Sequence, residues 1–147
     1  MPMPALLMLA DEAAYRAHFE ATYCRGPIVT FDGIAVRFRK RDFGHCCFES
    51  DRRTRLKAYF SSKRAERLDW IQAALQDPGA DLRVGWDNSR KRYDYDRRVA
   101  IVSGNYVVVI SLLANKKSAE FVTAYLADSG ETVQLIKKAP KWRKAQK

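Results

Sequence analysis

The chain has 147 residues and a mass of 16.9 kDa, which suits a single domain, and its 47% apolar content is enough for one core, so we expect no intrinsic disorder. No apolar stretch approaches the ~20 residues of a membrane-spanning helix, and Ala5–Ala10 is too short for a signal-peptide core, so we expect a soluble, cytoplasmic protein. With 27 basic residues against 17 acidic ones, the net charge of +10 favours a polyanionic partner: RNA, DNA or an anionic membrane.

The first elements are a helix and a hairpin. Alanines and Phe19 recur among charged residues in Asp11–Tyr23, which predicts a helix that Asp11 can cap. Two β-rich runs, Ile28–Phe31 and Ile34–Phe38, follow it and are separated by Asp32-Gly33. Because this dipeptide favours a two-residue turn, the two runs are predicted to pair as a hairpin.

Further helices are predicted in the middle of the chain. The segment Phe43–Glu49 fits a short strand or a loop, and Asp51–Phe60 fits a helix that Ser50 or Asp51 would cap. The clearest helix is Lys63–Gln76, in which Leu68, Ile71 and Leu75 recur at helical spacing. Asp77-Pro78-Gly79 ends it.

The second half of the chain has the period of a sheet. Its predicted strands are Leu82–Trp86, Arg92–Asp96, Val99–Val102, Tyr106–Leu112 and Ser118–Ala127. The continuous apolar run Tyr106–Leu113 predicts a central strand covered on both faces. In the last strand, strict alternation places Phe121, Thr123 and Tyr125 on one face.

This order of elements predicts an α+β fold, with N-terminal helices packed on a C-terminal antiparallel sheet. We find no repeat, linker or composition shift, so residues 1–140 are predicted to form one domain. Residues 141–147 are predicted to be a mobile basic tail.

The basic residues are clustered. Six of them lie in residues 137–147, which leaves 21 basic against 17 acidic residues, or +4, elsewhere. The internal clusters are Arg37–Arg41, Arg52–Lys57, Lys63–Arg67 and Arg90–Arg98. Any one of them could be a solvated face, but together with the tail they favour a shared phosphate-binding surface. A membrane surface fits less well, because the tail has no amphipathic apolar face.

The three cysteines, Cys24, Cys46 and Cys47, make a poor disulfide framework and fit a reducing compartment. His45-Cys46-Cys47 lacks a second ligand pair to complete a zinc site. We therefore interpret Cys46 and Cys47 as small buried side chains on a strand, and we predict no metal and no cofactor.

The sequence contains no glycine-rich phosphate loop and no G-x-S-x-G elbow. Asp94 and Asp96 share a predicted strand face, but flanking arginines explain them as well as a two-metal site would. Of the two histidines, His18 fits a helix surface. His45 lies between apolar residues with basic clusters nearby, where it is either a structural histidine or an acid–base catalyst.

Cleavage of RNA without a metal needs few groups. The ribose 2′-hydroxyl attacks the phosphorus while one group accepts its proton, another protonates the leaving 5′-oxygen, and cations stabilise the phosphorane. An imidazole with an ordinary pKa near ~6.5 can do either proton transfer at neutral pH. A histidine, a cluster of Arg and Lys, and a Thr or Tyr hydroxyl would therefore suffice.

Several motifs occur in an order that resembles a known family. They are FDGIAV (31–36), FGHCCFE (43–49), KRAERLDWIQAALQDP (63–78), YVVVI (106–110), EFVTAYL (120–126) and KKAPKW (137–142). Together they resemble the phage-associated branch of the Barnase–EndoU–colicin–RelE-like (BECR) nucleases over about residues 28–142.

The resemblance implies helices followed by an antiparallel sheet of about four strands, and metal-independent RNase activity in a toxin or phage effector. It assigns catalytic roles to His45, Thr123 and Tyr125. The basic residues from which phosphate ligands would come are Arg52, Arg53, Lys57, Arg64 and Arg67. From spacing alone, Arg67 could instead pair with Glu66 or Asp69, Thr123 could be an ordinary strand residue, Tyr125 a half-buried aromatic, and Trp70 a core residue.

Three hypotheses follow. The chain is a ribonuclease that leaves a 2′,3′-cyclic phosphate, with RNA, such as tRNA, as its substrate. Alternatively, it is a non-catalytic nucleic-acid-binding module with steeply salt-dependent binding. In the third hypothesis, its basic surface meets an acidic antitoxin or immunity protein.

Overall fold

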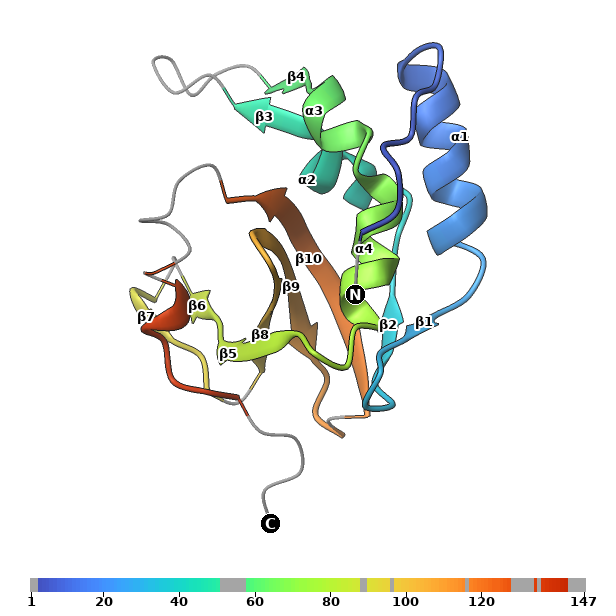
Figure 1. Cartoon of the computed structure of the whole chain (residues 1–147). Coiled ribbons are helices and arrows are strands. Elements are labelled where there is room, and N and C mark those ends of the chain that lie inside the picture. The colour runs from blue at the N-terminus through green and yellow to red at the C-terminus, as the bar shows by residue number, and fades with distance from the viewer. Residues whose placement is uncertain are drawn as a thin grey trace.

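The computed structural model describes residues 3–50, 58–87, 90–95, 97–115, 117–127, 134 and 136–142. It has a mixed α+β architecture (Figure 1). The elements are α1 (Glu12–Tyr23), β1 (Ile28–Val29), β2 (Ala35–Arg37), α2 (Asp42–Cys47), β3 (Phe48–Ser50), β4 (Ala58–Phe60), α3 (Ser62–Ala65), α4 (Leu68–Leu75), β5 (Asp81–Val84), β6 (Trp86–Asp87), β7 (Arg92–Tyr93), β8 (Arg98–Ser103), β9 (Tyr106–Leu112) and β10 (Ser118–Leu126).

Helix α1 begins as predicted, because the Asp11 side chain accepts a hydrogen bond from the Ala14 amide at 2.9 Å. Its buried residues Tyr15, Phe19 and Tyr23 are spaced four apart and so face one side. The Tyr23 hydroxyl donates to the Leu68 carbonyl at the start of α4 and accepts from the Gln72 amide. One buried tyrosine therefore ties α1 to α4.

The main sheet has the strand order β1-β2-β10-β9-β8-β5. Within this sheet β5, β8, β9 and β10 pair antiparallel, as predicted, and so do β1 and β2. The β1–β2 hairpin joins them through a parallel pairing of β2 with β10, so the prediction of a wholly antiparallel sheet is wrong at this point. The chain returns to β2 only after a long excursion through the helices α2–α4 and the strands β3–β9, and such a crossover permits parallel pairing.

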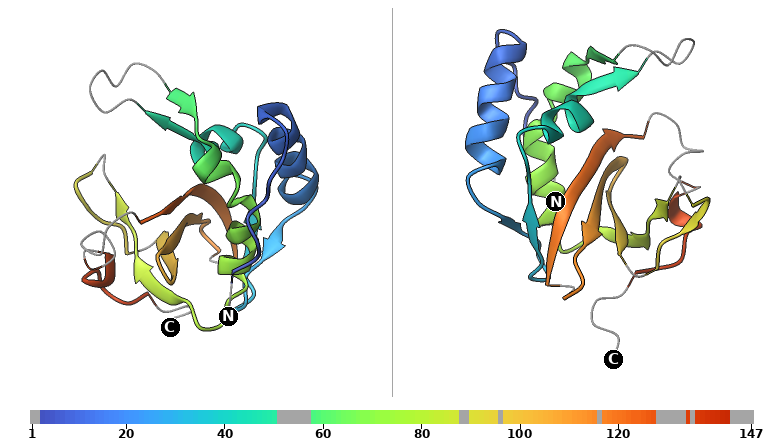
Figure 2. Two further views of the ribbon diagram at one scale, coloured as in Figure 1. Left: turned by 45° about the horizontal axis from the view of Figure 1, so that its top comes forward. Right: turned by 180° about the vertical axis from the view of Figure 1, so that it is seen from behind.

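Both faces of the sheet are covered (Figures 1 and 2). The helices pack on one face, where the larger core includes Phe19, Leu68, Val108 and Ile110. On the other face, Val107 packs in a smaller cluster that Ile136 of the C-terminal segment partly covers. The strand β9 is therefore the doubly covered inner strand that its apolar run predicted.

The strand β10 contains a bulge. Phe121 pairs with Ile110 and Thr123 pairs with Val109, so β10 has one extra residue, Val122, between the two pairs. Phe121 consequently faces the helices, whereas Thr123 and Tyr125 face the other side. The prediction that Thr123 and Tyr125 share a face is confirmed, and the prediction that Phe121 shares it is wrong because the bulge reverses the alternation.

Two local predictions differ from the structure. The segment Phe43–Glu49 is mostly the short helix α2, which the Asp42 side chain helps to begin by accepting from the Arg39 amide. Residues 58–60 form the strand β4, not helix, since Phe60 packs on Phe43 and Phe48 while β4 pairs with β3. Residues 51–57 of that predicted helix lie outside the described residues.

The predicted helix 63–76 is two helices. Ser61 caps α3 by accepting from the Arg64 amide. The backbone leaves the helical region at Arg67, with φ −105° and ψ 17°, before α4 begins. Arg64 of α3 stays partly exposed, whereas the apolar residues of α4, such as Leu68 and Ile71, are buried in the core.

The packed part of the chain extends two residues past the predicted domain end at residue 140. The backbone of Lys141 forms an isolated antiparallel β-bridge with Arg83 of β5, and the Trp142 amide donates to the Leu82 carbonyl at 3.0 Å. Residues 143–147 of the predicted tail lie outside the described residues. Within the described ranges, no helix has the length and apolar character needed to cross a membrane.

We predict that Asp77 couples stability to acid pH. Its carboxylate accepts from the Gly79 amide and the Ser103 hydroxyl, each at 2.8 Å, and these bonds lower its pKa. The stabilisation is therefore complete above the ordinary pKa of about 3.9 and is lost as the pH falls through the lower native value. Asp77→Asn should cost about 2 kcal/mol at pH 7.

Urea unfolding of the wild type and the variant at pH 7 and at pH 3 tests this. The variant should lose less stability than the wild type between the two pH values. Equal losses would show that Asp77 does not carry this part of the pH dependence.

Candidate functional site

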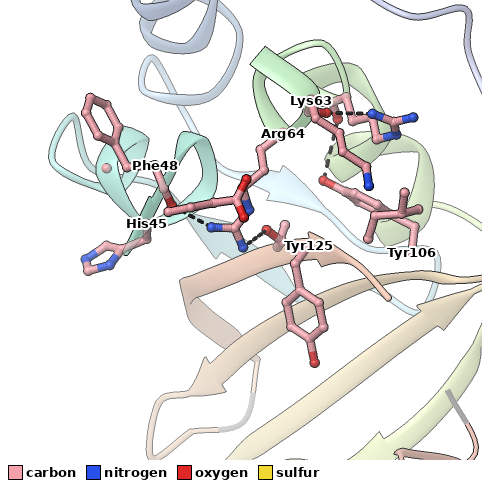
Figure 3. A pocket seen from close by; sticks show the side chains of 11 residues that line it. His45, Phe48, Lys63, Arg64, Tyr106 and Tyr125 are labelled. Carbon is pink, nitrogen blue, oxygen red and sulfur yellow. Dashed lines mark hydrogen bonds between the residues drawn. The ribbon is translucent and has the colours of Figure 1, made fainter. Parts of the chain in front are cut away.

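A cleft of about 570 Å³ opens where the α2–β3 junction, α3 and the last residues of β10 meet. The residues that line it (Figure 3) include three cations, a histidine, a carboxylate and two phenols: Lys63, Arg64, Arg67, His45, Glu49, Tyr106 and Tyr125. The cleft therefore combines an excess of positive charge with groups able to exchange protons.

Arg64 organises the cleft wall. Its Nη1 donates to the Phe48 carbonyl at 2.6 Å and its Nη2 to the Ala124 carbonyl at 3.1 Å. The strand β2 pairs with β10 only through residues 118–120, so the edge of β10 beyond them has no strand partner in the described sheet. The guanidinium fills part of that gap and holds β3 beside β10 while its positive charge remains on the cleft wall.

The Arg67 guanidinium is also held in place by hydrogen bonds and by an aromatic ring. Its Nη1 donates to the Lys63 carbonyl at 2.6 Å and to Glu66 Oε1 at 3.1 Å, and its guanidinium lies 5.0 Å from the centre of the Trp70 ring. Its Nε is the one buried side-chain nitrogen or oxygen among the described residues that lacks a hydrogen-bond partner. An unsatisfied buried N–H costs about 1–3 kcal/mol, so this arginine is placed at some expense of stability.

The alternatives left open for the α3–α4 residues are partly resolved. Arg67 does pair with Glu66, whereas Asp69 pairs with His18 at 2.7 Å. Trp70 packs on Tyr106 and donates its ring N–H to the Pro4 carbonyl at 2.8 Å. Trp70 is thus a packed residue and not a free stacking platform.

His45 lies in the last turn of α2 at the rim of the cleft. Its side chain is 59% exposed, and its Nε2 lies 4.0 Å from Asp42 Oδ1. The ring points outward, away from Arg64 and Tyr125 (Figure 3). His45 is joined to Thr123 through its backbone, because the Thr123 hydroxyl donates to the His45 carbonyl at 2.9 Å.

Tyr125 lines the cleft from β10 and is half-buried. Burial raises the pKa of its phenol, and the nearby Arg64 charge opposes this only in part. The phenol therefore stays protonated at neutral pH and can donate a hydrogen bond. Thr123 does not line this cleft; it lines a second one on the other side of the sheet, which Tyr125 also borders.

The structure brings together only part of the predicted site. Arg64, Arg67 and Tyr125 share the cleft with the backbone of His45, while Arg52, Arg53 and Lys57 lie outside the described residues. Sequence reasoning did not single out Glu49, Lys63 or Tyr106. The available signals were the glutamate at the end of FGHCCFE and the lysine at the start of the KRAER cluster.

The adjacent cysteines are buried packing residues, as interpreted, but they lie in the helix α2 and not on a strand. Cys46 and Cys47 are buried, with their sulfurs 3.6 Å apart, and both are free thiols. Burial raises the pKa of Cys46 well above its usual value, which keeps the thiol protonated. In the part of the chain that the structure describes, no three His, Cys, Asp or Glu side chains gather closely enough to hold a metal ion.

Comparisons with protein-family models, curated proteins and solved structures found no match to this chain.

We predict that Arg64 contributes strongly to stability. Arg64→Ala removes two charge-assisted hydrogen bonds to backbone carbonyls and should lower the free energy of unfolding by about 3 kcal/mol, measured by urea denaturation. Arg39→Ala is the matched control, because that exposed arginine pairs only with the Glu120 side chain and should cost less than about 1 kcal/mol. Equal effects of the two substitutions would contradict the role given to Arg64.

We predict a structural role for Thr123 that can be separated from catalysis. Thr123→Val keeps the shape but loses the bond to the His45 carbonyl, and should cost about 1 kcal/mol, or roughly 3 °C in Tm. Thr123→Ser should restore the wild-type Tm. If Val and Ser give the same Tm, the hydroxyl does not hold α2 on β10.

Proposed function

We propose that this chain is a metal-independent ribonuclease of the BECR kind that leaves a 2′,3′-cyclic phosphate. The observation that carries the proposal is the cleft that Lys63, Arg64 and Arg67 line together with Tyr125 and Glu49. Fixed cations beside a neutral phenol are suited to a phosphodiester whose negative charge increases in the transition state.

In the proposed reaction, the 2′-oxygen forms a bond to phosphorus while the bond from phosphorus to the 5′-oxygen breaks. A general base accepts the 2′-hydroxyl proton, and a general acid gives a proton to the leaving 5′-oxygen. His45 and Glu49 are the candidates for these two roles. Tyr125 donates a hydrogen bond to a non-bridging phosphate oxygen, and the arginines balance the charge on the phosphorane.

This assignment requires the His45 ring to turn toward the cleft when RNA binds. The ring is exposed. Among the interactions of the described residues, the contact of its Nε2 with Asp42 Oδ1 at 4.0 Å is the one that would hold it in the outward orientation. Exposed side chains change rotamer in picoseconds to nanoseconds, so the turn adds no slow step. Thr123 would act indirectly, by fixing the α2 backbone from which the imidazole projects.

We expect the purified protein to cleave single-stranded RNA in EDTA and to leave 2′,3′-cyclic phosphate ends. His45→Ala and Tyr125→Phe should each lower kcat/KM by about 10² or more, because each removes a group that acts in the transition state. His18→Ala is the control histidine, since His18 pairs with Asp69 outside the cleft and should retain activity.

Inert wild-type protein with intact RNA would overturn the proposal, as would full activity of His45→Ala. A second function, binding of RNA without cleavage, is favoured by one observation: the outward orientation of the His45 ring. That function predicts steeply salt-dependent binding and no cyclic phosphate after long incubation with excess protein.

A further inference from the structure

A second cleft, of about 590 Å³, lies on the sheet face opposite the helices. Its floor is formed by Ala100, Val109 and Val122 of three neighbouring strands. Trp86 and Tyr93 of the β6–β7 hairpin border it, and so do Ile136 and Ala139 of the C-terminal segment. A cleft of this size with mostly apolar walls suits a small flat ligand or part of a larger one.

The hairpin wall is aromatic and partly open to solvent. Trp86 and Tyr93 are cross-strand partners, with ring centroids 5.2 Å apart at 85°, and Tyr95 lies 6.4 Å beyond Tyr93. Trp86 is 47% exposed and Tyr95 is 61% exposed. Large aromatic rings left in water beside a cleft are typical of a surface that stacks on a ligand.

The hairpin is held close to the sheet at a fixed distance. The Gly85 amide donates to the Arg98 carbonyl, and the Gly85 carbonyl accepts from the Asp94 amide, both at 2.9 Å. A Cβ at position 85 would meet the Arg98 Cβ at 2.7 Å, so only glycine permits this approach. The aromatic wall is therefore preorganised and does not depend on a ligand for its position.

Exposed basic residues neighbour the lining residues in the sequence, on both the hairpin and the C-terminal segment. The hairpin carries the exposed residues Arg90, Lys91 and Arg92, and the C-terminal segment carries the exposed residues Lys137, Lys138 and Lys141. Arg98 also lines the cleft. Aromatic rings beside an apolar floor, with cations on the same two elements, complement a nucleobase that stacks while its phosphates remain outside.

We propose that the second cleft is a nucleobase subsite for single-stranded RNA whose backbone runs through the first cleft. The proposal rests on the proposed function, since it extends the same substrate across the sheet. Tyr125 of β10 borders both clefts, so one strand position lies between them. A base stacked against Trp86 would thus set which nucleotide presents its phosphate to Arg64 and Arg67.

The test uses two non-cleavable probes of about ten nucleotides, 2′-O-methyl oligouridylate and an abasic oligomer with the same number of phosphates. Binding to the wild type is measured by anisotropy of labelled probes. The wild type should bind the base-bearing probe about tenfold more tightly than the abasic one. Trp86→Ala should remove this preference and leave the affinity for the abasic probe unchanged.

Two further variants keep the test decisive. Trp86→Phe retains an aromatic ring and should retain most of the preference, which separates stacking from a folding defect. Phe31→Ala is the matched control, because Phe31 is similarly exposed at 41% and lies on the β1–β2 hairpin, outside both clefts. Equal binding of the two probes by the wild type, or an unchanged preference in Trp86→Ala, would overturn the proposal.

The two proposals can fail separately. A preference for bases that depends on Trp86, without any RNA cleavage, would leave the subsite standing and refute the nuclease. Cleavage of RNA by a protein that binds both probes equally would refute the subsite and leave the nuclease standing.

Discussion

The bulge at Val122 in β10 is the constraint on which the arrangement of both clefts depends. One extra residue reverses the alternation of side chains, so that Phe121 and Ala124 pack toward the helices while Thr123 and Tyr125 face the other side. An unbroken strand would have had to place Tyr125 on the same side as Phe121. The bulge therefore gives a strand that contributes to the core along its whole length and still presents a phenol at the border of two clefts.

The partial pairing of β10 creates a second requirement. Since β2 ends its pairing with β10 at Glu120, the later backbone groups on that edge need other partners. Arg64 meets this need at the Ala124 carbonyl, and the Thr123 hydroxyl donates to the His45 carbonyl of α2. These two bonds bring α2 and α3 to the end of the strand. The cleft exists because a strand edge was closed by a helix and a guanidinium instead of by another strand.

The described basic residues include two groups, those that line the first cleft and those exposed elsewhere. The net charge of +10 is spread over the chain, but only Lys63, Arg64 and Arg67 of the described cations line the first cleft. Arg64 and Arg67 are both held by backbone carbonyls, so their charges are fixed in space at little further cost in side-chain entropy. The cations of the β6–β7 hairpin and the C-terminal segment are exposed instead, a setting suited to affinity for a polyanion.

Local sequence patterns alone determined the α+β class, helix α1 with its Asp11 cap, the β1–β2 hairpin and the inner strand β9, because each depends on residues close together in the chain. The tertiary structure decided the helical form of α2, the strand β4, the break at Arg67 and the bulge in β10, which depend on contacts with distant residues. It also decided which predicted residues meet: Arg64, Arg67 and Tyr125 share a cleft, while the His45 ring points away from it. Spacing specifies side-chain direction only within one regular element, and this site is assembled from five: α2, β3, α3, β9 and β10.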